Sequence, residues 1–140
     1  MKRLLFLLFC LGQIVVLTGC RTEKKEEGKK DLEFQIVSGK EIPEEMQRQI
    51  EAQKEEPFWI TYGDQESLYA GRGYGRKETS GCSVCVDTCC EGGELIYIHT
   101  SLIGPDQDAE ESEDRSEPSD TPYVVVKMKW SRKQIVFQGK

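Results

Sequence analysis

Hydrophobic and polar positions alternate along much of the second half of the chain. Between residues 58 and 63 the side chains of Phe58, Ile60 and Tyr62 fall on one face, and the same two-residue period returns further on. A period of two is typical of β-strands that bury one face. We therefore predict strands over residues 32–39, 58–63, 67–75, 82–86, 94–104, 123–130 and 134–137.

One earlier segment, residues 41–57, has a different period. Ile42, Met46 and Ile50 recur every four residues, which gives the single apolar stripe of an amphipathic helix. Pro43 suits the first turn of such a helix, and Pro57 marks its end. The chain is thus expected to form one helix before the main run of strands.

Successive strands with short connections and a single early helix predict a mainly β protein. The expected architecture is a small antiparallel β-sandwich or sheet with one N-terminal amphipathic helix. An α+β arrangement is the alternative.

The N-terminus changes where this domain is expected to act. Lys2 and Arg3 precede an apolar run over residues 4–17, which is shorter than the ~20 residues of a transmembrane helix and typical of a secretory signal. The following Leu17-Thr18-Gly19-Cys20 resembles a bacterial lipobox, whose cysteine receives a diacylglycerol and becomes the mature N-terminus. Cys20 is therefore the predicted lipidation site of a membrane-anchored lipoprotein on the extracytoplasmic face, because two acyl chains anchor stably.

The remaining chain divides into a charged tether, residues 20–31, and a single β-rich domain, residues 32–140, after the signal peptide of residues 1–19. Loss of Lys2 and Arg3 leaves 17 basic and 25 acidic residues, a net charge of −8. An acidic domain argues against nucleic acid and against adhesion to anionic lipid, so the membrane is expected to be reached through the lipid alone. The acidic residues 106–120 are expected to form a solvated loop that can be shortened at little cost.

Four cysteines, Cys82, Cys85, Cys89 and Cys90, lie close together in the domain. A strand over residues 82–86 sends Cys82 and Cys85 to opposite faces, which disfavours a zinc knuckle, and we predict no metal and no cofactor. The oxidising location permits disulfides, and a turn over residues 87–93 would allow Cys85–Cys89 or Cys82–Cys90 pairing. Buried thiols that serve as small apolar side chains are the other interpretation, and the sequence leaves both open.

His99 is the single histidine and shares a strand face with Ser101. A catalytic triad needs a nucleophile on the imidazole and a carboxylate behind it. Adjacency on one strand does not provide that arrangement, so we predict no catalytic residues and no enzyme.

Three segments, GYGRKETSGCS, ELIYIHTSLIGP and TPYVVVKM, occur in order along the domain. Together they resemble the C-terminal domain of the PrcB family, named for a subunit of a surface protease complex. The resemblance implies a β-rich, non-catalytic domain that binds and stabilises a partner, either a surface protease or another envelope protein. The family motif has tyrosine where this chain has Cys82.

The first of these segments supplies the predicted partner-binding loop. Its glycines leave room for a partner backbone, and its basic residues place positive charge on an acidic domain. The predicted loop comprises Arg72, Gly73, Tyr74, Gly75, Arg76, Lys77, Thr79 and Gly81. A tight hairpin whose glycines serve only the turn, a protease inhibitor of chagasin type, and a thiol or metal module built on the cysteines of residues 82–90 are the alternatives.

Overall fold

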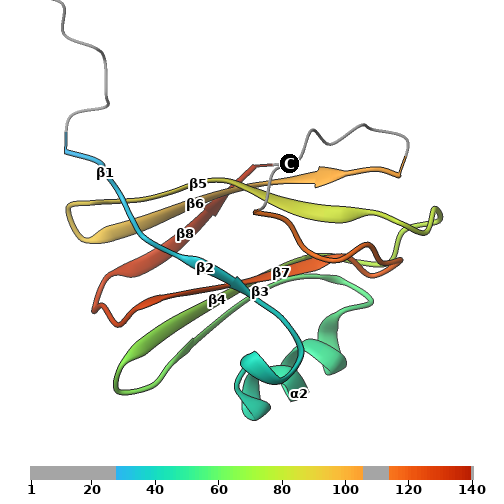
Figure 1. Ribbon diagram of the computed structural model, residues 1–140, viewed down its shortest axis with the longest axis horizontal. Coiled ribbons are helices and arrows are strands. Elements are labelled where there is room, and N and C mark those ends of the chain that lie inside the picture. Colours follow the sequence, from blue (N-terminus) through green and yellow to red (C-terminus); the bar gives the residue numbers. More distant parts are fainter. Residues whose placement is uncertain (1–27, 106–113, 140) are drawn as a thin grey trace, which may run out of the picture.

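The computed structural model describes residues 28–105 and 114–139 (Figure 1). Two four-stranded sheets face each other, and one helix covers the outer face of the second sheet. The protein is mainly β, and the predicted β-sandwich with one N-terminal helix is confirmed.

The strands of the two sheets follow one another in space in a fixed order. The first sheet contains β1 (Lys30–Asp31), β5 (Ser83–Gly92), β6 (Leu95–Ile103) and β8 (Gln134–Gln138). The second contains β2 (Gln35–Val37), β7 (Tyr123–Lys129), β4 (Ser67–Tyr74) and β3 (Pro57–Gly63). Neighbouring strands are antiparallel except β8, which runs parallel to β6, so the last predicted strand exists but departs from the expected antiparallel pairing.

The main core lies between the sheets. Val84 and Val86 of β5 pack there with Val124 and Val126 of β7, as the alternating pattern of both strands predicts. A buried hydrogen bond of 2.7 Å also joins the sheets, between the hydroxyls of Tyr74 on β4 and Thr100 on β6. This polar contact fixes β6 over β4.

A second core lies between the second sheet and the helix. A short 3-10 helix, η2 (Gly39–Glu41), leads into α2 (Glu44–Gln53). The predicted stripe of Ile42, Met46 and Ile50 is buried here together with Phe58 and other side chains of the sheet. Pro43 stands just before α2 as its N-cap, one position earlier than predicted.

The N-terminal segment crosses from one sheet to the other. β1 pairs with β5, and β2 then pairs with β7, so this segment covers one side of the sandwich (Figure 1). Residues 30–31, predicted as the end of the tether, therefore belong to the folded domain. The predicted signal peptide and Cys20 lie outside the described residues.

Residues 114–119, hereafter the strap, run along the edge of β5. The Val86 N–H donates to the Asp114 carbonyl and the Ser116 N–H to the Val84 carbonyl, each at 2.9 Å. Cys82 and Ser119 also exchange backbone hydrogen bonds. The prediction of a solvated loop is therefore wrong for this part of the acidic segment, because β1 pairs only with the end of β5 and the rest of that edge needs partners. Residues 106–113 of the segment lie outside the described residues.

The opposite side of the sandwich is formed by β3 and β8. Since β6 lies over β4 and β5 contacts β7, the order of strands places β8 and β3 on the same side. Within the described residues, β3 pairs only with β4 and β8 pairs only with β6. Both sheets thus end on this side in a strand with one unpaired edge, hereafter the open side.

Candidate functional site

Arg72 and Trp59 form the most unusual side-chain arrangement on the open side. Trp59 of β3 lies directly opposite Arg72 of β4, so both side chains project from the same face of the sheet. The Arg72 guanidinium carbon lies 4.4 Å from the centre of the Trp59 ring and 4.7 Å from that of Tyr74. Trp59 is nevertheless 61% exposed. The result is a cation held between two aromatic rings at the rim of the sandwich.

The charge of Arg72 is not matched by an acid. Its Nη1 atom is buried and has no hydrogen-bond partner. In the part of the chain that the structure describes, no carboxylate forms an ion pair with Arg72. A buried donor without a partner costs about 1–3 kcal/mol, so this group can gain energy from an acceptor supplied by another molecule.

The other residues of the predicted partner-binding loop have structural roles. Gly71 and Gly73 belong to β4, and a Cβ at Gly73 would lie 2.1 Å from a ring carbon of Phe58. These glycines therefore make room for core side chains, and the prediction that they open a path for a partner backbone is wrong. Gly75 has a positive φ of 77° and lies against Pro57, which fits a turn that only glycine adopts easily.

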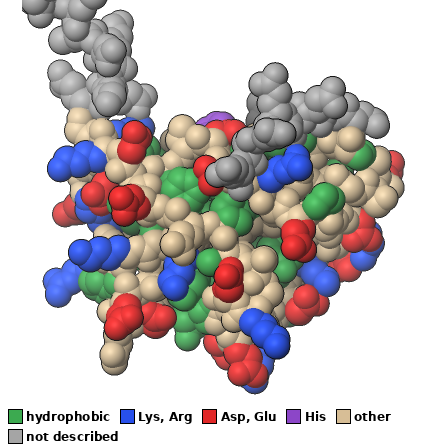
Figure 2. Space-filling model, in the orientation of Figure 1, with side chains coloured by type: hydrophobic (Ala, Val, Ile, Leu, Met, Phe, Trp, Pro, Cys, Tyr) green, Lys and Arg blue, Asp and Glu red, His purple; other side chains and the backbone are tan. Residues whose placement is uncertain are grey.

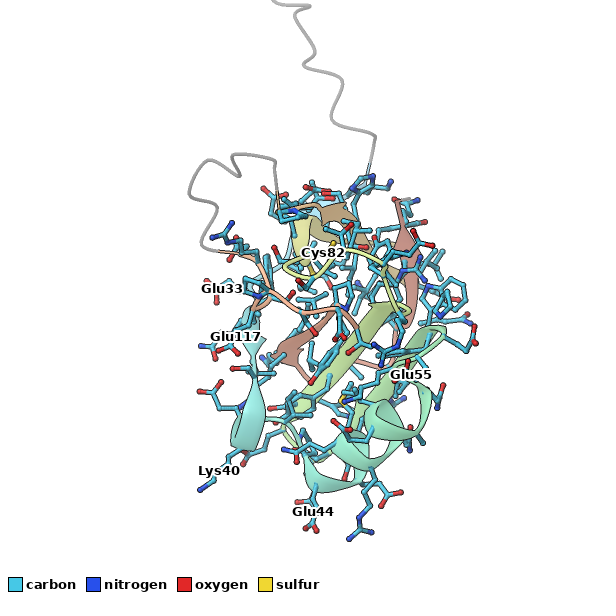
Figure 3. The ribbon with its side chains drawn as sticks, turned by 90° about the vertical axis from the view of Figure 1, so that its right-hand side faces the viewer. Glu33, Lys40, Glu44, Glu55, Cys82 and Glu117 are labelled. Atoms are coloured by element: carbon cyan, nitrogen blue, oxygen red, sulfur yellow. The ribbon has the colours of Figure 1, made fainter. Side chains whose placement is uncertain are left out.

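Arg76 is also committed within the domain. Its guanidinium donates to Glu55 Oε1 at 2.6 Å and to Asp120 Oδ2 at 2.8 Å, and so ties the end of the helical region to the chain that follows the strap. The hydrogen bond from Arg76 lowers the pKa of Glu55 below its ordinary value. Figure 3 shows Glu55 beside α2, beneath the two sheets. The positive charge predicted for partner binding is thus largely neutralised at Arg76.

The tip of the connection from β4 to β5 remains exposed. Glu78, Thr79 and Ser80 face solvent, and Gly81 follows with a φ of 88°. Lys77 is held through its backbone N–H, which donates to the Asp120 carbonyl at 2.7 Å. Of the eight predicted loop residues, Arg72 is the one that the structure brings to the open side with an unsatisfied donor.

The cysteines are distributed along an extended strand. β5 continues through Gly92 with a bulge between Val86 and Thr88, so the turn predicted over residues 87–93 is wrong. Cys82, Cys89 and Cys90 carry free thiols, and the extended strand does not provide the bend that the disulfide pairings required. Cys82 lies at the start of β5, where its Sγ donates to the Thr79 carbonyl at 3.4 Å (Figure 3).

Burial governs the chemistry of these thiols. Cys82, Cys85 and Cys89 are buried, and burial, followed by the neighbouring Cys90, raises the pKa of Cys89 to about 12. Within residues 28–105 and 114–139, no three His, Cys, Asp or Glu side chains gather closely enough to hold a metal ion. The arrangement favours cysteines that act as small apolar side chains.

Asp87 lies at the bulge of β5 and was not singled out by the sequence. Its carboxylate contacts His99 Nδ1 at 2.8 Å and accepts a hydrogen bond from the Ser101 hydroxyl at 3.1 Å. The carboxylate therefore stands between the serine and the histidine, whereas a triad needs the imidazole in the middle. Two polar residues at alternate positions of β6, facing an unexplained Asp, were the only sequence signal for this cluster.

Two open grooves flank β2 on the side that the N-terminal segment crosses. One of about 650 Å³ includes Leu32, Phe34 and Lys129 in its lining, and one of about 600 Å³ includes Ile36, Glu117 and Tyr123. Figure 2 shows hydrophobic side chains in the middle of this face among charged side chains of both signs. Neither groove gathers the convergent polar groups of a small-molecule site.

No protein family, curated protein or solved structure matches this chain. The resemblance to the PrcB domain therefore stays a prediction. Within the described residues, no helix is long and apolar enough to cross a membrane.

Proposed function

We propose that this chain is a membrane-anchored lipoprotein of the bacterial cell envelope whose β-sandwich domain binds a partner protein without catalysis. The lipobox ending at Cys20 supports the anchor, and the partner class implied by the PrcB resemblance is a surface protease. The observation that carries the binding role is the open side, where Trp59 is 61% exposed beside the unmatched charge of Arg72.

The geometry of the chain supports this division of labour. The N-terminal segment enters the domain at β1, on the side opposite β3 and β8. An anchor attached there leaves the open side accessible to a partner in the envelope. Exposed aromatic residues and arginine are also the residue types that carry most energy at protein interfaces.

Replacement of Cys20 by alanine tests the anchor. The natural protein should partition into the detergent phase of a temperature-induced phase separation, because diacylglycerol supplies two acyl chains. The Cys20→Ala variant should remain in the aqueous phase or keep its signal peptide. A mature-sized Cys20→Ala band in the detergent phase would contradict lipidation.

Partner binding needs a separate test. Covalent cross-linking in intact envelopes, followed by mass spectrometry, should give one dominant protein partner whose cross-links map to the open side. Inhibition of papain by the purified protein would instead support the chagasin-type inhibitor. Cross-links spread evenly over the domain would contradict a dedicated binding surface.

A further inference from the structure

The edge strand β3 lacks the features that normally protect an exposed edge. It has seven residues, PFWITYG, and none of them is charged. Exposed edges in soluble proteins are usually short, charged or covered, because a bare row of backbone groups invites another strand. β1 and β2 are only two and three residues long, and the strap covers part of β5. β3 therefore has the character of a strand that is paired when the protein functions.

The hairpin between β3 and β4 sets which backbone groups of β3 are available. The Asp64 N–H donates to the Ser67 carbonyl at 2.9 Å and closes the hairpin. Hydrogen-bonded and non-hydrogen-bonded pairs alternate along an antiparallel ladder, and the register from Gly63 back to Pro57 is unbroken. Counting back from Asp64, the N–H and C=O groups of Trp59 and Thr61 point away from β4, towards the open edge.

The side chains next to these backbone groups favour an acidic ligand. Arg72 stacks against Trp59, and its Nη1 atom is buried without a partner. Trp59 is the more exposed of the two tryptophans on the surface, so its ring has room to turn aside. A carboxylate that enters there can accept the unsatisfied hydrogen bond and form a charge-assisted pair with the guanidinium.

We propose that β3 is the docking strand for an extended segment of the partner protein, and that this segment carries an aspartate or glutamate. The segment adds to the second sheet by backbone hydrogen bonds to Trp59 and Thr61, and its carboxylate pairs with Arg72 as the Trp59 ring moves. This proposal rests on the proposed protein-binding function and specifies the chemistry of the bound segment.

The test uses the full chain in detergent with Trp130→Phe, which leaves Trp59 as the single tryptophan. Displayed libraries of extended peptides, with the central position fixed as Glu in one and Gln in the other, serve as probes. The Glu library should yield binders, and the Gln version of each should bind at least about tenfold more weakly, the effect of ~1.4 kcal/mol. Binding should also change the fluorescence of Trp59.

Two matched substitutions at Thr61 separate edge pairing from other modes. Thr61→Pro removes the outward N–H at a position where an edge strand tolerates proline, whereas Thr61→Val keeps the N–H and the side-chain shape. Thr61→Pro should abolish peptide binding while Thr61→Val retains it. Arg72→Gln should remove the preference for Glu, and this variant decides the matter if Thr61→Pro loses its native circular dichroism spectrum.

Absence of enrichment in the Glu library, or binding that survives Thr61→Pro in a folded protein, would overturn the proposal. Dimers in sedimentation that Thr61→Pro dissociates, without peptide enrichment, would show that β3 pairs with a second copy instead. Peptide binding without detergent partitioning would refute the anchor and leave the β3 proposal standing. Cross-links on the open side that persist in both Thr61→Pro and Arg72→Gln would do the reverse.

Discussion

Gly73 is glycine because the Phe58 ring occupies the space that a side chain would need. A Cβ at this position would lie 2.1 Å from the ring, which is 3% exposed and part of the second core. We expect Gly73→Ala to lower the free energy of unfolding by about 1–3 kcal/mol, the usual cost of overpacking. Gly104→Ala is the control, because its Cβ meets nothing within 4 Å. Equal melting temperatures for the two variants would contradict the packing role of Gly73.

Cys89 and Cys90 are neighbours with different environments. Burial raises the pKa of Cys89 from 9.0 to about 12, while Cys90 is half-buried. At pH 8 we expect iodoacetamide to modify Cys90 well before Cys89, as measured by mass spectrometry of the digested protein. In urea both should react at similar rates. Rapid modification of Cys89 in the folded protein would show that this part of β5 opens.

The same shift sets the sign of a pH effect on stability. The folded pKa of Cys89 lies above its unfolded value, so the folded state holds the proton more tightly. The contribution of this thiol to stability is therefore complete below pH 9 and is lost as the pH rises towards about 12.

At the level of elements, the strap decides whether β5 has a complete set of partners. Its backbone bonds to Cys82, Val84 and Val86 continue the pairing that β1 makes only at the far end of the strand. Removal of residues 106–120 with a short Gly/Ser connection should therefore lower the melting temperature, since several buried backbone groups lose their partners. Replacement of residues 106–113 alone by a Gly/Ser segment of equal length is the control. Equal melting temperatures for both variants would show that the strap contributes nothing.

At the level of the whole molecule, the two sheets are joined by apolar packing and by the Tyr74–Thr100 hydrogen bond. Thr100 is fully buried, so Tyr74→Phe leaves its hydroxyl without this partner, at an expected cost of about 1–3 kcal/mol. Thr100→Val in the same chain removes both polar groups and should recover much of the loss. Denaturant unfolding of the two single variants and the double variant measures the coupling. Strict additivity would show that the hydroxyls do not interact.

Local sequence patterns determined the kinds of elements in this protein. The two-residue period predicted the strands, and the four-residue recurrence of Ile42, Met46 and Ile50 predicted the helix and its buried face. These signals can be read from sequence because side-chain direction repeats with the geometry of each element. The lipobox is local in the same sense, and it remains a prediction.

The tertiary structure alone decided which segments became neighbours. The period of a strand tells which face a side chain occupies, but not which distant strand will lie beside it. Pairing of the strap with β5, the parallel placement of β8, and the contact of Phe58 with Gly73 all join residues far apart in the chain. The candidate site has the same origin, because Arg72 is an ordinary basic residue of a glycine-rich segment until the ladder with β3 sets it against Trp59 at an unpaired edge.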